Sequence, residues 1–104
     1  MSDFVTVARV GDIPEAGLLG VSVNGREICL VRSQGKIYAL EDRCSHEEFP
    51  LSNGDVTDGE ITCALHGARF DLSSGTPRAL PAVTSVRTYE VRVEGEDVQV
   101  KVES

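Results

Sequence analysis

Two pairs of cysteine and histidine in the middle of the chain constrain its fold more than any other feature. Cys44 and His46 are separated by one residue, Cys63 and His66 by two, and sixteen residues lie between the pairs. The chain has only three cysteines and two histidines, so both histidines stand close to a cysteine. Thiolate is a soft ligand that suits iron–sulfur clusters and zinc, and neutral imidazole suits both metals. The pattern therefore indicates a metal centre held by two short segments that face each other.

Several kinds of site would use these four residues. Two facing loops would hold two irons, with Cys44 and Cys63 on one iron and His46 and His66 on the other. A structural zinc site is the main competitor, although zinc fingers usually pair Cys with Cys and His with His. A catalytic thiol–imidazole pair is a further alternative, but no other residue in the chain looks like its orienting group. The remaining alternative is that the four are ordinary loop residues without a metal. The residue types and spacing favour a site with two irons, and the three alternatives stay open.

The rest of the sequence is typical of an all-β protein. The dipeptide Asn24-Gly25 favours a type I′ turn, because both central residues of that turn adopt positive φ. Short strands also fit residues 60–62 and 69–72, between many turn residues. Apolar and polar residues alternate with the period of two that indicates a strand in six longer segments: 4–10, 18–23, 26–32, 36–40, 89–93 and 98–102.

We expect one domain from this pattern. Residues 1–41 and 84–104 would form an antiparallel β-sandwich base, and residues 42–83 an inserted, loop-rich subdomain that binds the metal. A turn-rich insertion of this length needs something to order it, and metal binding would do so because it is coupled to folding. The third cysteine, Cys29, falls in an expected strand, where a buried hydrophobic role is typical.

The net charge of −7 excludes some partners. Nucleic acid and anionic membranes repel an acidic chain, and no apolar run reaches the roughly 20 residues that span a bilayer. The first residues lack the basic and apolar regions of a secretory signal, and three cysteines suit a reducing compartment. We therefore expect a cytoplasmic protein. We also expect a monomer.

The negative charge is concentrated in one segment. Residues 41–71 hold eight acidic and two basic residues, a net charge of −6. This segment either solubilises the protein or attracts a basic partner to it. In the second case, acids such as Glu47, Glu48 and Asp71 would surround the histidines at an exposed end of the molecule.

The spacing C-x-H-x16-C-x2-H resembles the Rieske [2Fe–2S] motif, and the similarity covers essentially the whole chain. The resemblance implies a Rieske-type fold with one [2Fe–2S] cluster per chain, bound by Cys44, His46, Cys63 and His66. Pro81-Ala82 is similar to the proline loop that covers the cluster in that family. Similar flanking segments are Asp12-Ile13-Pro14-Glu15, 50–56, 58–61, 66–72 and Gly75.

Four positions distinguish this chain from the high-potential Rieske proteins of respiratory complexes. Those proteins add a bridged cysteine to each loop, where this chain has Phe49 and Leu65. They also place Ser and Tyr hydroxyls near the cluster, where this chain has Ala68 and Phe70. Fewer hydrogen-bond donors to the cluster lower its potential, so we expect a value of roughly −150 mV. The pattern resembles the ferredoxins of bacterial multicomponent oxygenases.

This resemblance implies an electron carrier that is not itself an enzyme. The chain would pass single electrons from a flavin-dependent NAD(P)H reductase to a terminal oxygenase of an aromatic-hydrocarbon dioxygenase system. It has no Gly-rich dinucleotide motif and no spare histidine for a mononuclear iron. The alternatives are a small Rieske subunit of a non-oxygenase enzyme, similar to that of nitrite reductase, or a redox-sensing module.

Overall fold

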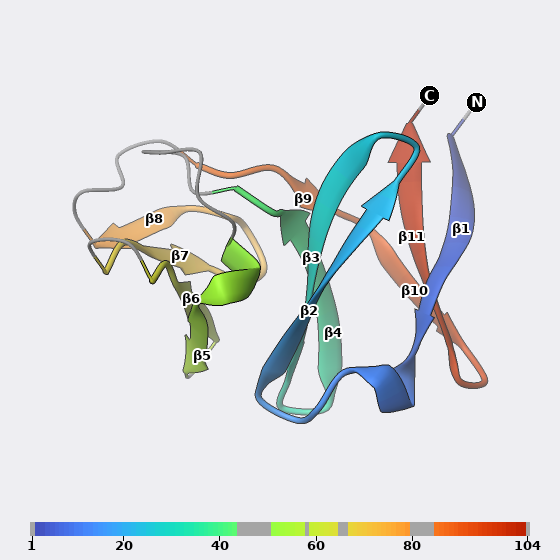
Figure 1. The fold of residues 1–104 in the computed structure, drawn as a ribbon, viewed down its shortest axis with the longest axis horizontal. Coiled ribbons are helices and arrows are strands. Elements are labelled where there is room, and N and C mark those ends of the chain that lie inside the picture. The colour runs from blue at the N-terminus through green and yellow to red at the C-terminus, as the bar shows by residue number, and fades with distance from the viewer. Residues whose placement is uncertain (1, 44–50, 58, 65–66, 80–84, 104) are drawn as a thin grey trace.

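The computed structural model describes residues 2–43, 51–57, 59–64, 67–79 and 85–103, and its strands form three antiparallel sheets (Figure 1). The first sheet has the order β1 (Ser2–Arg9), β11 (Asp97–Glu103), β10 (Val91–Glu94). The second has the order β2 (Gly17–Val23), β3 (Arg26–Ser33), β4 (Lys36–Glu41), β9 (Thr88–Tyr89). The third has the order β5 (Asp55–Thr57), β6 (Glu60–Thr62), β7 (Arg69–Asp71), β8 (Pro77–Ala79). Two short 3-10 helices, η1 (Val10–Asp12) and η2 (Leu51–Asn53), complete the described elements, and the expected all-β fold is confirmed.

Two tight turns set the register of the second sheet. Asn24 and Gly25 have φ of 51° and 79°, as a type I′ turn requires, and they join Val23 to its partner Arg26. Gln34 and Gly35 have φ of 53° and 78° and join β3 to β4 in the same way. The turn at Asn24-Gly25 was expected from the sequence and is confirmed.

The second sheet lies between two hydrophobic cores, because β3 is buried on both faces. Residues Ile28, Cys29, Leu30 and Val31 are all 0% exposed, which confirms the expected burial of Cys29. The first core, toward the third sheet, contains Cys29, Val31, Leu40, Leu51, Ile61, Cys63, Ala68, Phe70, Leu72 and Val86. The second core, between this sheet and the first sheet, contains Ile13, Val23, Ile28, Leu30, Ala39, Val98, Val100 and Val102.

The chain moves from the second sheet to the first at Glu90. Tyr89 pairs with Ala39 of β4, whereas Val91 pairs with Val100 of β11, so the strand expected over 89–93 is two short strands. The Glu90 carbonyl accepts a hydrogen bond of 2.9 Å from the Lys101 N–H at this crossing. The three-residue strands β5 and β8 were not expected from the sequence.

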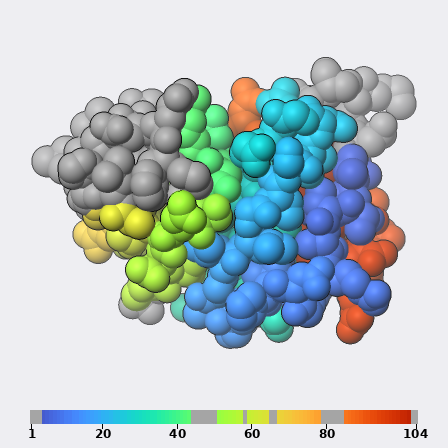
Figure 2. Space-filling model, viewed as in Figure 1, coloured from blue at the N-terminus to red at the C-terminus, as the bar shows by residue number. Residues whose placement is uncertain are grey.

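The 3-10 helix η2 and strand β5 lie against β2, which places the third sheet beside the second (Figures 1 and 2). Both ends of the described chain, on β1 and β11, lie at the opposite side of the molecule from the third sheet. In the part of the chain that the structure describes, no helix is long and apolar enough to cross a membrane.

Candidate metal centre

Of the four expected ligands, Cys63 is the one that lies within the described residues. It directly follows β6 and is only 1% exposed, within the first core. Its backbone N–H donates a hydrogen bond of 2.7 Å to the carbonyl of Ala68, beside the strand pair Thr62–Arg69. Gly67 has a φ of 72°, in the left-handed region that favours glycine, where the chain returns to β7. The backbone therefore fixes the position of Cys63. The other expected ligands, Cys44, His46 and His66, lie outside the described residues.

Gly54 brings the end of the first Cys–His segment against β6. A Cβ at Gly54 would overlap the carbonyl group of Thr62, the residue before Cys63. The Gly54 N–H donates a hydrogen bond of 2.9 Å to Leu51, which is fully buried in the same core as Cys63. The chain that leaves the first motif is therefore packed beside the strand that leads into the second motif. This packing is what a site shared by the two motifs requires.

The surroundings of Cys63 on the β7 side are apolar. Ala68 and Phe70 are both 0% exposed and belong to the first core, as Cys63 does. Neither side chain has a hydroxyl that would donate a hydrogen bond to a cluster sulfur. This arrangement supports the expected low potential, which stays a prediction. The other positions that the sequence analysis compared with Rieske proteins, Phe49, Leu65, Pro81 and Ala82, lie outside the described residues.

Asp42 and Ser52 bracket the segment that contains Cys44 and His46. The Ser52 backbone N–H donates to Asp42 Oδ1 and the Ser52 hydroxyl donates to Asp42 Oδ2, each at 2.7 Å. The Asp42 N–H donates in turn to the Glu27 carbonyl at 3.0 Å. Sequence reasoning missed this pair, since nothing in the spacing of the two residues marks them as partners.

Asp71 holds the turn between β7 and β8. Its Oδ2 accepts hydrogen bonds from the backbone N–H and the hydroxyl of both Ser73 and Ser74, at 2.7–3.1 Å. Arg78 donates to Oδ1 at 3.3 Å. The hydrogen bonds from Ser73 and then Ser74 hold the pKa of Asp71 well below its usual range. The expectation that Asp71 lies near the histidines and faces a partner stays a prediction, because His46 and His66 lie outside the described residues. Glu47 and Glu48, the other acids in that expectation, lie outside the described residues.

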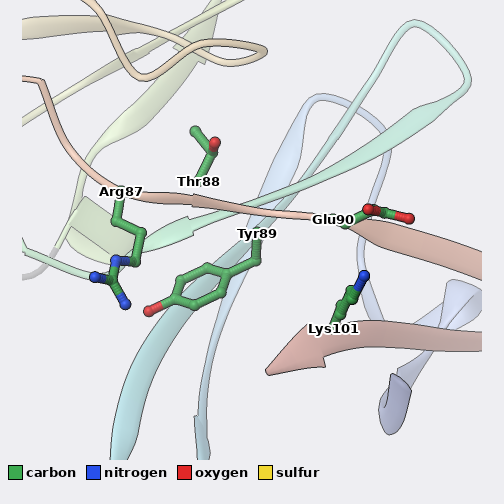
Figure 3. Close-up of a pocket in the computed structure, with 5 residues that line it drawn as sticks. All are labelled: Arg87, Thr88, Tyr89, Glu90 and Lys101. Carbon is green, nitrogen blue, oxygen red and sulfur yellow. The ribbon is translucent and has the colours of Figure 1, made fainter. Parts of the chain in front are cut away.

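A shallow polar hollow lies along β9 (Figure 3). It is lined by Arg87, Thr88, Tyr89 and Glu90, and by Lys101 from β11. Figure 3 shows the Arg87 and Tyr89 side chains extending to the same side of the strand. None of these five residues belongs to either Cys–His motif.

The chain belongs to the Rieske [2Fe–2S] domain family, whose model matches residues 3–90. Over 101 residues it is 38% identical to the ferredoxin component of the naphthalene 1,2-dioxygenase/salicylate 5-hydroxylase systems of Ralstonia sp., and the alignment covers 97% of each chain. It is similar to the solved ferredoxin of carbazole 1,9a-dioxygenase from Nocardioides aromaticivorans IC177, with a TM-score of 0.89, 37% identity, and coverage of 93% of this chain and 95% of that chain. A chain in a complex of reduced oxygenase and oxidized ferredoxin in carbazole 1,9a-dioxygenase matches with a TM-score of 0.89 and 27% identity, over 94% of this chain and 92% of that chain.

Membership of this family confirms the Rieske-type fold and the [2Fe–2S] cofactor that the sequence led us to expect. The zinc site and the catalytic thiol–imidazole pair are therefore set aside. The relatives are ferredoxin components of oxygenase systems, which confirms the expectation of an electron-transfer component rather than an enzyme.

Proposed function

We propose that this chain is a one-electron carrier in which Cys44, His46, Cys63 and His66 hold one [2Fe–2S] cluster. The observation that carries the proposal is the placement of Cys63, buried at the end of β6 beside the chain that leaves the first motif. Two thiolates and two imidazoles are the donors of a Rieske cluster. Neutral imidazoles in place of two thiolates reduce the negative charge of the site, so the bound cluster supplies an electron couple at higher potential than a four-thiolate centre.

We further propose that the sheets divide into a base, residues 1–41 and 84–104, and a cluster-binding subdomain, residues 42–83, within a single domain. The pairing supports this division, because β5, β6, β7 and β8 pair only with one another among the described strands. The base would then serve as a rigid support for the segments that hold the cluster.

The proposed electron donor is a flavin-dependent NAD(P)H reductase, and the proposed acceptor is a terminal oxygenase. The names of the relatives support an oxygenase system, and the carbazole 1,9a-dioxygenase complex pairs a ferredoxin with an oxygenase. Because the sequence contains no motif for a second cofactor, substrate chemistry takes place in the partner. We place the protein in the cytoplasm as a monomer.

Metal analysis and reconstitution test this function. The purified chain should hold two irons and two acid-labile sulfides and give a Rieske-type EPR signal when reduced. NAD(P)H oxidation by a flavin reductase and a terminal oxygenase should then depend on this chain. A colourless protein with one zinc ion would overturn the proposal, and turnover restored only with a non-oxygenase terminal enzyme would replace the proposed acceptor.

Cysteine variants give this test a matched control. Cys63→Ser should lose the cluster or change its ligation, whereas Cys29→Ala should retain it. Both cysteines are buried in the first core, but only Cys63 belongs to a Cys–His motif. Equal cluster content in the two variants would contradict the assignment of Cys63 as a ligand.

A further inference from the structure

The two motifs differ in how the backbone around them is held. Cys63 lies between β6 and β7, which are neighbouring strands, and its N–H is bonded to the Ala68 carbonyl across that hairpin. The segment with Cys44 and His46 instead lies between β4 and η2. Among the described elements these two are not partners in a sheet. Strand pairing therefore does not hold the two ends of the first segment together.

We propose that Asp42 and Ser52 form a side-chain clamp that positions the first Cys–His segment for the cluster. This inference rests on the proposed function, because it assigns the pair a role toward the ligands Cys44 and His46. Both oxygens of one carboxylate are used, one for the Ser52 N–H and one for the Ser52 hydroxyl, each at 2.7 Å. Hydrogen bonds to an ionised acceptor are shorter and stronger than neutral ones, and these two are partly buried. The clamp thus joins two residues that are ten positions apart.

Gly20 of β2 gives the clamp its seat on the second sheet. A Cβ at Gly20 would lie 3.0 Å from Asp42 Oδ2 and 3.0 Å from Ser52 Oγ, closer than ordinary van der Waals contact. Gly20 is not among the described glycines with positive φ. A glycine is therefore needed at this position because a side chain would not fit, and not because of the backbone conformation. The Asp42 N–H also bonds to Glu27 of β3 at 3.0 Å, which fixes the clamp against the neighbouring strand.

The clamp is close in sequence to both proposed ligands of its segment. Asp42 comes two residues before Cys44, and Ser52 six residues after His46. Ser52 also follows Leu51, which is buried in the same core as Cys63. Closing the clamp therefore sets where the first segment starts and ends relative to the second motif. Asp42 and Ser52 are positioning residues, since they would act on the cluster through the ligands.

Five variants separate the hydrogen bonds from the charge. Asp42→Ala removes both bonds, Ser52→Ala removes the hydroxyl bond alone, and Asp42→Asn removes the charge while keeping an oxygen acceptor. Gly20→Ala keeps both clamp residues but adds a methyl group that presses against Asp42 Oδ2 and Ser52 Oγ. Ser52→Thr keeps the hydroxyl and should rescue the function of the clamp.

Asp12→Ala is the matched control. Asp12 is an exposed aspartate of η1 that accepts the Arg9 N–H at 3.0 Å, so its loss removes the same charge and a comparable hydrogen bond away from the third sheet. The readouts are the rate at which an iron chelator bleaches the cluster and the width of the EPR lines of the reduced protein.

A hydrogen bond to a charged group is worth on the order of tenfold in an equilibrium constant. We therefore expect Ser52→Ala to lose iron about tenfold faster than the wild type, and Asp42→Ala faster still, if both bonds close the segment. Gly20→Ala should accelerate iron loss as well, and the EPR lines of all three should broaden because the ligands are held less uniformly. Ser52→Thr and Asp12→Ala should behave as the wild type, and Asp42→Asn should fall between the wild type and Asp42→Ala.

Iron loss at the wild-type rate in Ser52→Ala and Gly20→Ala would overturn the clamp, even if Asp42→Ala failed to fold. An equal defect in Asp42→Ala and Asp42→Asn, with Ser52→Ala unaffected, would also overturn it, because the charge alone would then act. A wild-type chain without iron or sulfide would instead remove the proposed function. A loaded wild type with unaffected variants would remove only the clamp.

Discussion

Replacing Phe70 with tyrosine tests whether apolar surroundings set the reduction potential. Phe70 is fully buried in the core that contains Cys63, so Phe70→Tyr brings a hydroxyl into an apolar core. A hydroxyl that donates to a cluster sulfur stabilises the reduced form, which carries the extra negative charge. If this bond is about tenfold stronger in the reduced form, the one-electron potential rises by about 59 mV. The wild-type potential should lie near the low end of the Rieske range, roughly −150 mV.

The same substitution carries a cost if the hydroxyl finds no acceptor. A buried polar group without a hydrogen bond destabilises the folded state by about 1–3 kcal/mol. A redox titration followed by visible absorbance, together with thermal unfolding, therefore reads both outcomes. Phe4→Tyr is the control, because Phe4 lies on β1 of the first sheet, with the Arg92 guanidinium 4.3 Å from its ring centre. Phe4→Tyr should leave the potential unchanged. A Phe70→Tyr protein with both the potential and the stability of the wild type would refute the reasoning.

Three further predictions concern the acids and the buried thiol. Asp71→Ala should lower the free energy of unfolding at neutral pH, because Ser73 and Ser74 stabilise the ionised form and hold its pKa below the usual value. That stabilisation is present above about pH 4 and is lost as the pH falls further. Urea unfolding curves of the variant and the wild type should therefore converge in acid, and a difference in stability that does not change with pH would contradict this prediction. Burial raises the pKa of the Cys29 thiol, so an alkylating reagent should modify Cys29 only after unfolding, as mass spectrometry would show. If the acids of residues 41–71 attract a basic partner, reversing Glu47 and Glu48 to Lys should slow reduction at low salt, whereas a flat salt response in stopped flow would exclude that attraction.

The strands of the second sheet were predictable because their signals are local. The alternation in β2, β3 and β4 and the turn at Asn24-Gly25 are contained in a few adjacent residues. The break at Glu90 was not predictable, because alternation continues from Tyr89 to Val93 whichever sheet each residue joins. The three-residue strands β5 and β8 were not identified, although β6 and β7, which are equally short, were.

The candidate site shows the same division between local and distant information. Cys63 was predicted as a ligand because cysteine and histidine are rare in the chain and occur together, and this role stays a prediction. The Asp42–Ser52 pair was missed because it depends on a contact across ten residues and on space left by Gly20, on another strand. Aspartate, serine and glycine are common turn residues, so their types carry no signal of such a contact.

The double burial of β3 has a consequence for protein engineering. Successive residues of this strand face opposite cores, so Ile28 and Leu30 pack with Val98 and Val100 of β11, while Cys29 packs toward the third sheet. A library that varies Ile28, Leu30, Val98 and Val100 could therefore be screened for thermostability without changing the residues that pack around Cys63. A library that varies Cys29 and Val31, which face the core with Cys63, would instead alter the surroundings of that cysteine while the packing between the first and second sheets is unchanged. One strand thus offers two nearly independent sets of design positions, interleaved residue by residue.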